Sequence, residues 1–454
     1  MIVRKDKLNI LKKQNPLIIH KERKMKKISA SMIFLMLAMV INAATLDIRT
    51  TEFKDFKVGE EIKFKVTAKA DNGSLLKEGI FKIHLKYCGY SIADKPVEID
   101  LSKGNPAFFT TKLDRPGFIL AQPTPYKTAD GKSHSWKYDI VTPSLGGAAV
   151  EPEKIRQAGT VPADFDKFWQ DGVEKFKNAK ITVTDNVQKR LGYKVLRVRV
   201  EFPDGSGAIE GVLSIPEGNG KFPAAVSIPG AGPGIMKASN ILPSSPKMIE
   251  LLMNIHPYPI PKTRAEMVKL YQEMNNKMST KAYFYENAWD REKYVYRNAW
   301  LAISSAIDYV VKLPQFDGKN FAAIGHSQGG GTAIALGYLN KNITCVLASE
   351  PAFCDHYGYL KQRQPGWPLL NFRLKGRSDK TMGYFDAATF AAKLNVPTLV
   401  SVGYLDTICY PASVYAAYNN IKASKTIFPM NHGHSHTVQS YNLFAEFLKK
   451  QFSK

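Results

Sequence analysis

The stretch Phe321-Ala-Ala-Ile-Gly325-His326-Ser327-Gln328-Gly329-Gly330-Gly331 places a serine between glycines, directly after a short apolar run. The run predicts a buried strand, and the small and apolar residues at 332–336 predict that a helix follows. A serine on such a strand-to-helix turn is typical of a nucleophile whose hydroxyl stands above the edge of a sheet. Glycine is expected at 325 and 329, because a side chain there would collide with the neighbouring strand or helix. The alternative is a glycine-rich turn with an incidental serine.

Apolar strands alternate with helices on both sides of this turn, from about residue 190 onward. Buried strands are predicted at 224–228, 249–255, 321–324, 344–349, 398–402 and 426–428. Helices are predicted at 286–312, 329–339, 412–421 and 440–451. This alternation predicts an α/β fold with a doubly wound, mainly parallel sheet. Two long stretches, 257–285 and 355–386, interrupt it, and we expect them to build lids or substrate walls.

The first part of the chain has a different pattern. Apolar and polar residues alternate along Ile62–Lys69 and again along 81–87, and turn residues separate these segments. Several short strands with regular turns predict an N-terminal β-sandwich (Ig-like) domain over residues 45–143. A glycine- and proline-containing segment at 144–160 is typical of a linker. We therefore expect residues 161–454 to form a separate catalytic domain.

Residues 1–44 have the features of a targeting segment. Met25-Lys26-Lys27 is a short positive region, residues 32–41 are continuously apolar, and Ala43-Ala44 provides small residues for cleavage. This pattern predicts a secretory signal peptide, with Met25 as the true start. The mature protein is then expected to be periplasmic or secreted, with no stable membrane insertion, because ten apolar residues are too few to span a bilayer comfortably. An uncleaved anchor is the alternative.

The chain is basic but has no signature of a nucleic-acid-binding protein. Its formal net charge is +23, from 63 Lys or Arg and 40 Asp or Glu, and ten of the basic residues lie in the first 44. The remainder contains no dense basic run and no zinc-finger or RNP pattern, so we expect a soluble protein with a basic surface. The four cysteines are too few for a disulfide scaffold, and buried free thiols are expected. A bridge from Cys345 to Cys354 or Cys409 is the alternative.

A serine hydroxyl needs a base to remove its proton, and the base needs an acid to orient it. In a fold of this kind the order along the chain is serine, acid, histidine. Asp406 follows the strand predicted at 398–402, which is where this architecture places the acid. Asp379 and Asp386 are rivals, but they lie in a lid-like stretch and off any predicted strand end.

Three histidines compete for the role of base: His432, His434 and His436. We choose His434, because Gly433 gives its loop room to approach the serine, and keep His432 as the alternative. The spacing His-x-His-x-His could also ligate zinc. Metal clusters of hydrolases normally add further carboxylates or histidines, and none lies in this loop, so no metal site is predicted.

The oxyanion of an acyl-transfer intermediate requires two N–H donors. One should be the backbone N–H of Gln328, the residue after the nucleophile. The other should come from the loop Pro229-Gly230-Ala231-Gly232-Pro233-Gly234, where glycines allow close approach. Ala231 is the best candidate for this donor, although the loop could also be an ordinary glycine/proline turn.

These residues resemble a known family. Gly325–Gly330, Asp406 before Pro411, the Gly433-His434 pair and the segment 161–169 are similar to the acetyl xylan esterase/cephalosporin C deacetylase family of α/β-hydrolases, over roughly residues 150–454. The resemblance implies hydrolysis of acetyl esters on sugars by a Ser-Asp-His triad without a cofactor. Ser327 would be the nucleophile, Asp406 the acid and His434 the base, with Ala231 and Gln328 as the oxyanion donors. It also implies that the chain could form a homo-oligomer.

Four features depart from the family pattern. The family's His-Gly-Tyr stands here as Pro229-Gly230-Ala231, its Arg-Gly-Gln as Asn254-Ile255-His256-Pro257, and its glutamate after the catalytic histidine as Ser435. Compact family members also lack the N-terminal domain. These changes affect the expected substrate more than the expected chemistry.

The sequence therefore predicts a secreted serine esterase that removes acetyl groups from acetylated sugars or polysaccharides such as xylan. Two other functions stay open. The first is a prolyl-peptidase-like or other acyl hydrolase on the same fold. The second is a non-catalytic glycan-binding protein, in which aromatic residues such as Trp136 and Trp367 stack on sugars.

Overall fold

The computed structural model describes residues 44–92, 95–137, 139, 144–185, 189–235, 237–238, 241–242 and 244–453. The predicted signal peptide therefore lies outside the described residues, except for Ala44. In the described part of the chain, no helix has both the length and the apolar character needed to cross a membrane.

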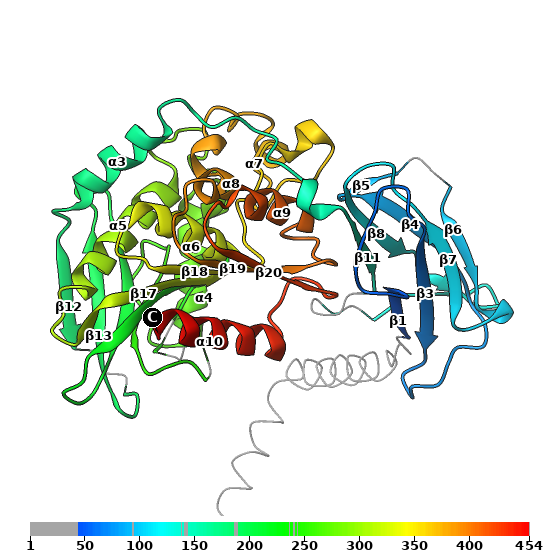
Figure 1. Cartoon of the computed structure of the whole chain (residues 1–454), viewed down its shortest axis with the longest axis horizontal. Helices are drawn as coiled ribbons and strands as arrows, with labels where there is room; N and C mark the ends of the chain where they lie inside the picture. The colour runs from blue at the N-terminus through cyan, green and yellow to red at the C-terminus, as the bar shows by residue number, and fades with distance from the viewer. Residues whose placement is uncertain are drawn as a thin grey trace, which may run out of the picture.

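The N-terminal part contains two sheets (Figure 1). Strands β1 (Thr45–Thr50), β3 (Ile62–Lys69) and β7 (Ala107–Thr111) form the smaller sheet. The larger sheet contains β2 (Asp55–Phe56), β4 (Ile80–Tyr87), β5 (Tyr90–Ser91), β6 (Val97–Asp100), β8 (Gly117–Pro123), β9 (Tyr126–Lys127), β10 (Ser133–His134) and β11 (Gly146–Val150). β3 shows why the sequence forms strands here, because Ile62, Phe64, Val66 and Ala68 are buried while the lysines between and after them are exposed.

β11 differs from the expectation for this region. Its residues were expected in a linker over 144–160, but Gly146–Val150 pairs with β8 antiparallel and with β2 in parallel. All five residues are buried, and a side chain at Gly146 would meet Ile48 on β1. The small side chains thus allow close packing between the sheets. The β-sandwich architecture and the domain bounds stay predictions.

The second part of the chain is built on a nine-stranded sheet. Its strands, in spatial order, are β12 (Ile181–Asp185), β13 (Tyr193–Glu201), β14 (Ala208–Pro216), β16 (Ile249–Met253), β15 (Phe222–Ile228), β17 (Phe316–His326), β18 (Cys345–Ser349), β19 (Thr398–Gly403) and β20 (Lys425–Met430). The last six in this order run parallel, as predicted. β12, β13 and β14 are antiparallel and were not predicted individually. The α/β fold class with a mainly parallel sheet is confirmed.

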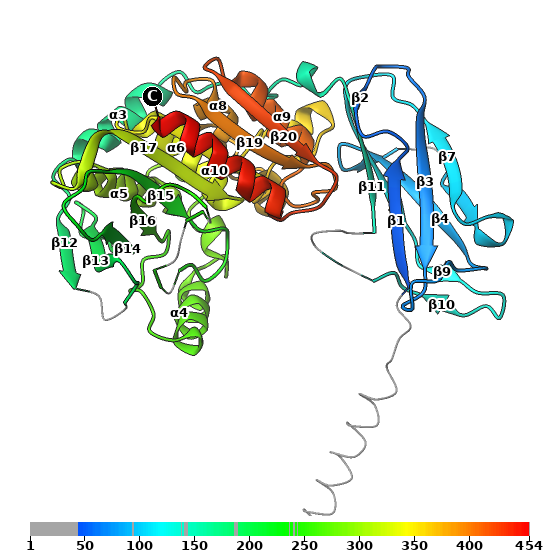
Figure 2. The ribbon, with the colours of Figure 1, turned by 60° about the horizontal axis from the view of Figure 1, so that its bottom comes forward.

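Helices cover both faces of this sheet (Figure 1, Figure 2). α3 (Phe165–Phe176), α5 (Val295–Val310), α6 (Gln328–Leu339), α8 (Ala387–Ala391) and α9 (Pro411–Asn420) form one layer, and α10 (Val438–Phe452) crosses β17 and β19 on the other face. α4 (Arg264–Lys277) and α7 (Leu370–Leu374) lie in the two long excursions. α5 is shorter than the helix predicted at 286–312, because turns occupy the residues before Val295, among them Asn287 with a positive φ of 57°.

The N-terminal sheets contact the loop that follows β19. The Tyr404 hydroxyl donates a hydrogen bond of 2.7 Å to Asp55 Oδ1, and the ring of Phe118 packs on the rings of Tyr404 and Tyr415. Gly147 lies so close to this loop that an added Cβ would sit 2.8 Å from the Tyr404 carbonyl oxygen. Both views show the N-terminal sheets beside α9 and the end of the sheet nearest to it (Figure 1, Figure 2). The two parts therefore meet next to the loop that carries Asp406.

Candidate active site

Ser327 occupies the sharp turn between β17 and α6 that the sequence predicts. Its backbone has φ 57° and ψ −121°, a strained conformation for a residue with a side chain, and the residue is 6% exposed. The Ser349 carbonyl at the end of β18 fixes the turn by accepting the Ser327 N–H at 2.9 Å. A Cβ at Gly325 would lie 2.1 Å from the Gly329 carbonyl carbon, and one at Gly329 would lie 1.9 Å from the Ile228 oxygen. A side chain at either glycine would therefore collide with backbone, as expected.

Gln328, at the first position of α6, is completely buried. Its Oε1 accepts hydrogen bonds from the hydroxyls of Tyr283 at 2.5 Å and Tyr296 at 2.6 Å, and its Nε2 donates to the Pro229 carbonyl at 3.3 Å. The side chain therefore ties the first turn of α6 to the loop after β15. The two tyrosines were not predicted, because they lie in a long excursion and on the following helix, with no local motif around them.

The loop from Pro229 to Gly234 passes next to Ser327. A Cβ on Gly230 would lie 3.8 Å from the Ser327 Cβ. Tyr258 donates a hydrogen bond of 2.6 Å to the Pro233 carbonyl, and Asn254 Oδ1 accepts the N–H of Ile235 at 2.8 Å. The loop is thus held by the segment that follows β16. Ala231 is exposed on this loop, and its role as an oxyanion donor stays a prediction.

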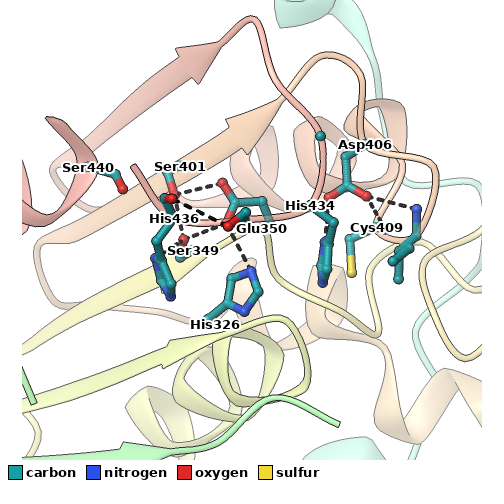
Figure 3. Close-up of polar contacts among 12 residues, drawn as sticks. His326, Ser349, Glu350, Ser401, Asp406, Cys409, His434, His436 and Ser440 are labelled. Carbon is teal, nitrogen blue, oxygen red and sulfur yellow. Dashed lines mark hydrogen bonds and ion pairs between the residues drawn. The ribbon is translucent and has the colours of Figure 1, made fainter. Parts of the chain in front are cut away.

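Asp406 and His434 are in direct contact. His434 Nδ1 and Asp406 Oδ2 are 2.7 Å apart (Figure 3). The other carboxylate oxygen, Oδ1, accepts the N–H groups of Ile408 at 2.8 Å and Cys409 at 2.9 Å. Asp406 is 1% exposed and the His434 side chain 9%. Asp406 comes from the loop after β19 and His434 from the loop after β20, so the fold joins two residues that are distant in the chain.

The environment of His434 favours its protonated form. Burial lowers the pKa of the imidazole, but the hydrogen bond and the charge of Asp406, with a smaller contribution from Glu350, outweigh burial and raise it above the ordinary 6.5. A histidine whose positive charge is stabilised in this way can accept a proton from a nearby hydroxyl. The pair has the chemistry of a base and its orienting acid.

The Cys409 thiol lies between this pair and Ser327. Its Sγ, a carboxylate oxygen of Asp406 and a ring nitrogen of His434 all lie within 4.8 Å of one another, and the thiol also interacts with the Ser327 hydroxyl. Among the residues that the structure describes, no hydrogen bond joins Ser327 directly to His434; such contacts are often long without substrate. These contacts nevertheless place the serine on the same side of the sheet as the pair.

The same three groups are the described residues that converge closely enough to hold a metal ion. A metal would need the thiolate of Cys409, yet complete burial raises its thiol pKa well above the ordinary value. The bond between Asp406 and His434 also occupies one carboxylate oxygen and one ring nitrogen of this donor set. The donor set therefore suits proton transfer better than metal binding. The four cysteines are buried, as expected.

The other candidate residues have different partners. His432 contacts the Gly433 carbonyl and Met430 sulfur, and His436 contacts the Ser349 hydroxyl at 3.2 Å. Asp386 caps α8 and accepts two further backbone N–H groups, which gives it a structural role. The three histidines do not converge, and His434 is the one that meets Asp406.

A second polar cluster adjoins His434 and was not predicted (Figure 3). It contains His326, Ser349, Glu350, Ser401 and His436. Glu350 follows the strand predicted at 344–349, so its position after a strand end was a signal that could have found it.

The class of protein follows from this arrangement and from comparison with known proteins. A parallel sheet with a serine on the turn after a central strand, and an acid and a histidine after the last two strands, is the arrangement of an α/β-hydrolase. Residues 151–451 match the family described as acetyl xylan esterase (AXE1). The chain belongs to this family and is a carboxylic ester hydrolase, as its sequence resemblance implied.

Individual relatives agree with this assignment. Acetyl esterase Axe7A of Xylanibacter ruminicola is 28% identical over 377 residues, which are 78% of this chain and 79% of the relative. Acetyl xylan esterase 1 from Thermoanaerobacterium sp. JW/SL YS485 has a similar fold, with a TM-score of 0.55 at 19% identity over 66% of this chain and 98% of its own. Acetyl xylan esterase from Paenibacillus sp. R4 has a TM-score of 0.53 at 20% identity, over 66% of this chain and 98% of its own.

Proposed function

We propose that the chain is a secreted serine esterase that removes acetyl groups from acetylated sugars or polysaccharides such as xylan, with Ser327, His434 and Asp406 as its triad. The observation that carries the proposal is the bond between His434 Nδ1 and Asp406 Oδ2 beside a serine on a strained turn. Names of related proteins support acetylated carbohydrate as the substrate. Secretion rests on the pattern of residues 1–44 in the sequence.

In the first half of the reaction, Ser327 Oγ attacks the acetyl carbonyl carbon while its proton passes to His434 Nε2. Asp406 holds the imidazole in the tautomer that leaves Nε2 free and stabilises the positive charge that forms. The backbone N–H groups of Gln328 and Ala231 would stabilise the oxyanion. The bond between the carbonyl carbon and the sugar oxygen then breaks, and His434 gives its proton to that oxygen.

In the second half, water attacks the acetyl-serine ester. His434 takes one proton from the water, acetate leaves with the new oxygen, and the proton returns to Ser327 Oγ. The reaction is therefore a hydrolysis that needs no redox partner.

The test is release of acetate from acetylated xylan by the wild type and by Ser327→Ala. We expect the variant to lose at least about 10⁴-fold of kcat, because the nucleophile is gone while the fold is kept. Ser424→Ala, which removes an exposed hydroxyl before β20, is the matched control and should keep wild-type activity. Equal activity of Ser327→Ala and the wild type would refute the proposal.

The peptidase alternative has its own assay. A prolyl-peptidase-like enzyme would cleave aminoacyl-p-nitroanilides, whereas a deacetylase should release little or no p-nitroaniline from them. Cleavage of the anilides at rates comparable to acetyl ester hydrolysis would replace the deacetylase proposal with the peptidase one.

A further inference from the structure

A second carboxyl group, that of Glu350, lies completely buried beside the proposed triad. It follows directly after Ser349, whose carbonyl holds the N–H of the nucleophile, and its own N–H donates to the Ser401 carbonyl at 3.0 Å. Its φ of 38° is unusual for a residue with a side chain. Glu350 thus directly follows β18, which lies between the strand that precedes Ser327 and the strand that leads to Asp406.

Two hydroxyls fix this carboxyl group. Ser349 Oγ donates to Glu350 Oε2 at 2.6 Å, and Ser401 Oγ lies 3.3 Å from Oε1 and 2.9 Å from Ser349 Oγ. His436 Nδ1 lies 3.2 Å from the same Ser349 hydroxyl. Burying a carboxyl group costs free energy, which these donors only reduce, and the mechanism proposed above gives the group no role.

His326 connects Glu350 with the base. His326 Nε2 lies 3.3 Å from Glu350 Oε2, although it is not aligned for a hydrogen bond to any described residue. The His326 ring packs on the His434 ring with centroids 4.7 Å apart, and on the His436 ring at 4.3 Å (Figure 3). Burial lowers the pKa of His326 to about 3, so the ring between the carboxyl group and the base is neutral.

We propose that Glu350 is a positioning residue of the esterase, which contacts the His326 ring that packs on His434 and whose negative charge stabilises the imidazolium that His434 becomes during the reaction. The proposal rests on the proposed function. Asp406 acts through a direct hydrogen bond, while Glu350 acts through space and through one intervening ring. A second negative charge in a water-poor site adds to the first, because charges there are weakly screened.

The titratable groups around Glu350 come from several elements. They are His326 at the end of β17, Asp406 and Cys409 on the loop after β19, His432, His434 and His436 on the loop after β20, and Tyr441 on α10. Burial, opposed by the Ser349 hydrogen bond and reinforced by the charge of Asp406, raises the pKa of Glu350 to about 7. The carboxyl group therefore gains its negative charge as the pH rises through about 7 and is fully ionised only at alkaline pH.

The decisive variant is Glu350→Gln, which keeps the size of the side chain and removes its charge. We expect kcat to fall about tenfold with KM within about twofold, and the acid limb of the kcat/KM profile to move to lower pH. Glu350→Asp keeps the charge, so its acid limb should stay closer to that of the wild type. Glu210→Gln, which alters another buried glutamate, on β14, is the matched control. It should change neither kcat nor the acid limb of the kcat/KM profile.

A second measurement does not depend on turnover. The pKa of the His434 ring is determined by NMR titration in the wild type and in Glu350→Gln, with His434→Gln used to assign the signal. A lower pKa in Glu350→Gln supports the proposal; an unchanged pKa together with unchanged kcat overturns it. An inactive wild type would count against the proposed function alone, because this titration would still decide the role of Glu350.

Should Glu350→Gln fail to fold, Ser401→Ala replaces it. This variant removes the hydroxyl beside Glu350 Oε1. It should lower kcat about two- to threefold, a smaller loss than in Glu350→Gln. Wild-type kinetics in Ser401→Ala, with an unchanged pKa of His434, would then refute the proposal.

Discussion

The hydroxyl of Tyr404, two residues before Asp406, donates a hydrogen bond to Asp55 in the N-terminal part of the chain. The acidic member of the proposed triad is therefore carried by a loop whose shape depends on residues that precede it by about 350 positions. Leu405, which lies between Tyr404 and Asp406, packs against Gly147 of β11. The N-terminal sheets thus take part in shaping the candidate active site.

The bond between Tyr404 and Asp55 leads to the first prediction. Tyr404→Phe removes a hydrogen bond worth about 1 kcal/mol, and the exposed Asp55 carboxylate then turns to water instead of holding the loop. We expect kcat for acetyl ester hydrolysis to fall by up to about fivefold as the Asp406 loop loosens, measured by acetate release. Tyr418→Phe on α9 makes none of these contacts and should behave as the wild type. A fully active Tyr404→Phe would show that the loop holds its shape without Asp55.

The second prediction concerns Asp406. Asp406→Asn keeps the shape of the side chain but favours the wrong tautomer of His434, so kcat should fall by about 10⁴-fold with the fold intact. Circular dichroism checks the fold, and acetate release checks the rate. Asp379→Asn, a rival acid from the sequence, serves as the control. A larger loss in the control than in Asp406→Asn would contradict the assignment.

The pH dependence of the reaction gives the third prediction. His434 must be neutral to act as a base, and Asp406 raises its pKa above 6.5. The acid limb of kcat/KM should therefore lie above pH 6.5 in the wild type. Removal of the Asp406 charge should move this limb to lower pH, because the imidazolium loses its main stabilising partner. A limb at the same pH in Asp406→Asn would show that another group titrates.

The glycines at the turn provide the fourth prediction. Gly325→Ala would place a Cβ 2.1 Å from the backbone of Gly329, and backbone cannot move aside cheaply. We expect a loss of stability of about 3 kcal/mol or more, or failure to fold, measured by thermal denaturation. Gly207→Ala, whose Cβ would meet side chains only at 3.4 Å and beyond, should fold normally. Similar melting temperatures for both variants would contradict the crowded turn.

The fifth prediction uses the buried carboxyl group of Glu350. Its folded pKa of about 7 exceeds the ordinary 4.5, so between these values the folded chain keeps a proton that the unfolded chain has released. This site therefore lowers stability as pH rises from 4.5 to 7. Glu350→Gln lacks the effect, and its melting temperature relative to the wild type should rise by a few degrees from pH 5 to pH 8. A difference that does not change with pH would contradict the shifted pKa.

The sequence predicted those parts of the site that are encoded locally. The turn at Ser327 is decided by neighbouring glycines and an apolar run, and Asp406 and His434 follow predicted strands in the order that the fold requires. Glu350 also follows a predicted strand, but nothing local shows that it would turn inward beneath His326. Its partners Ser401 and His436 come from other strand ends, so only the assembled sheet brings them together.

The fold shows the same division. The parallel strands have continuous apolar runs and were predicted. β12 and β13 carry mixed patterns because they lie toward one edge of the sheet. β14 is buried throughout, but Glu210, Gly211 and Ser214 interrupt its apolar run. β11 contains two glycines and two alanines, a composition that suggests a linker until its partners β8 and β2 are known. Whether such a segment forms a strand depends on its contacts with segments that are distant in the sequence.

The packing of Phe118 on Tyr404 and Tyr415 limits which other N-terminal domain could replace the present one in this chain. A recombination that joined the hydrolase part to an unrelated leading module would leave two tyrosine rings facing water and the Asp406 loop without its neighbour. In this chain, substitutions on one side of the contact therefore constrain which substitutions the other side can tolerate.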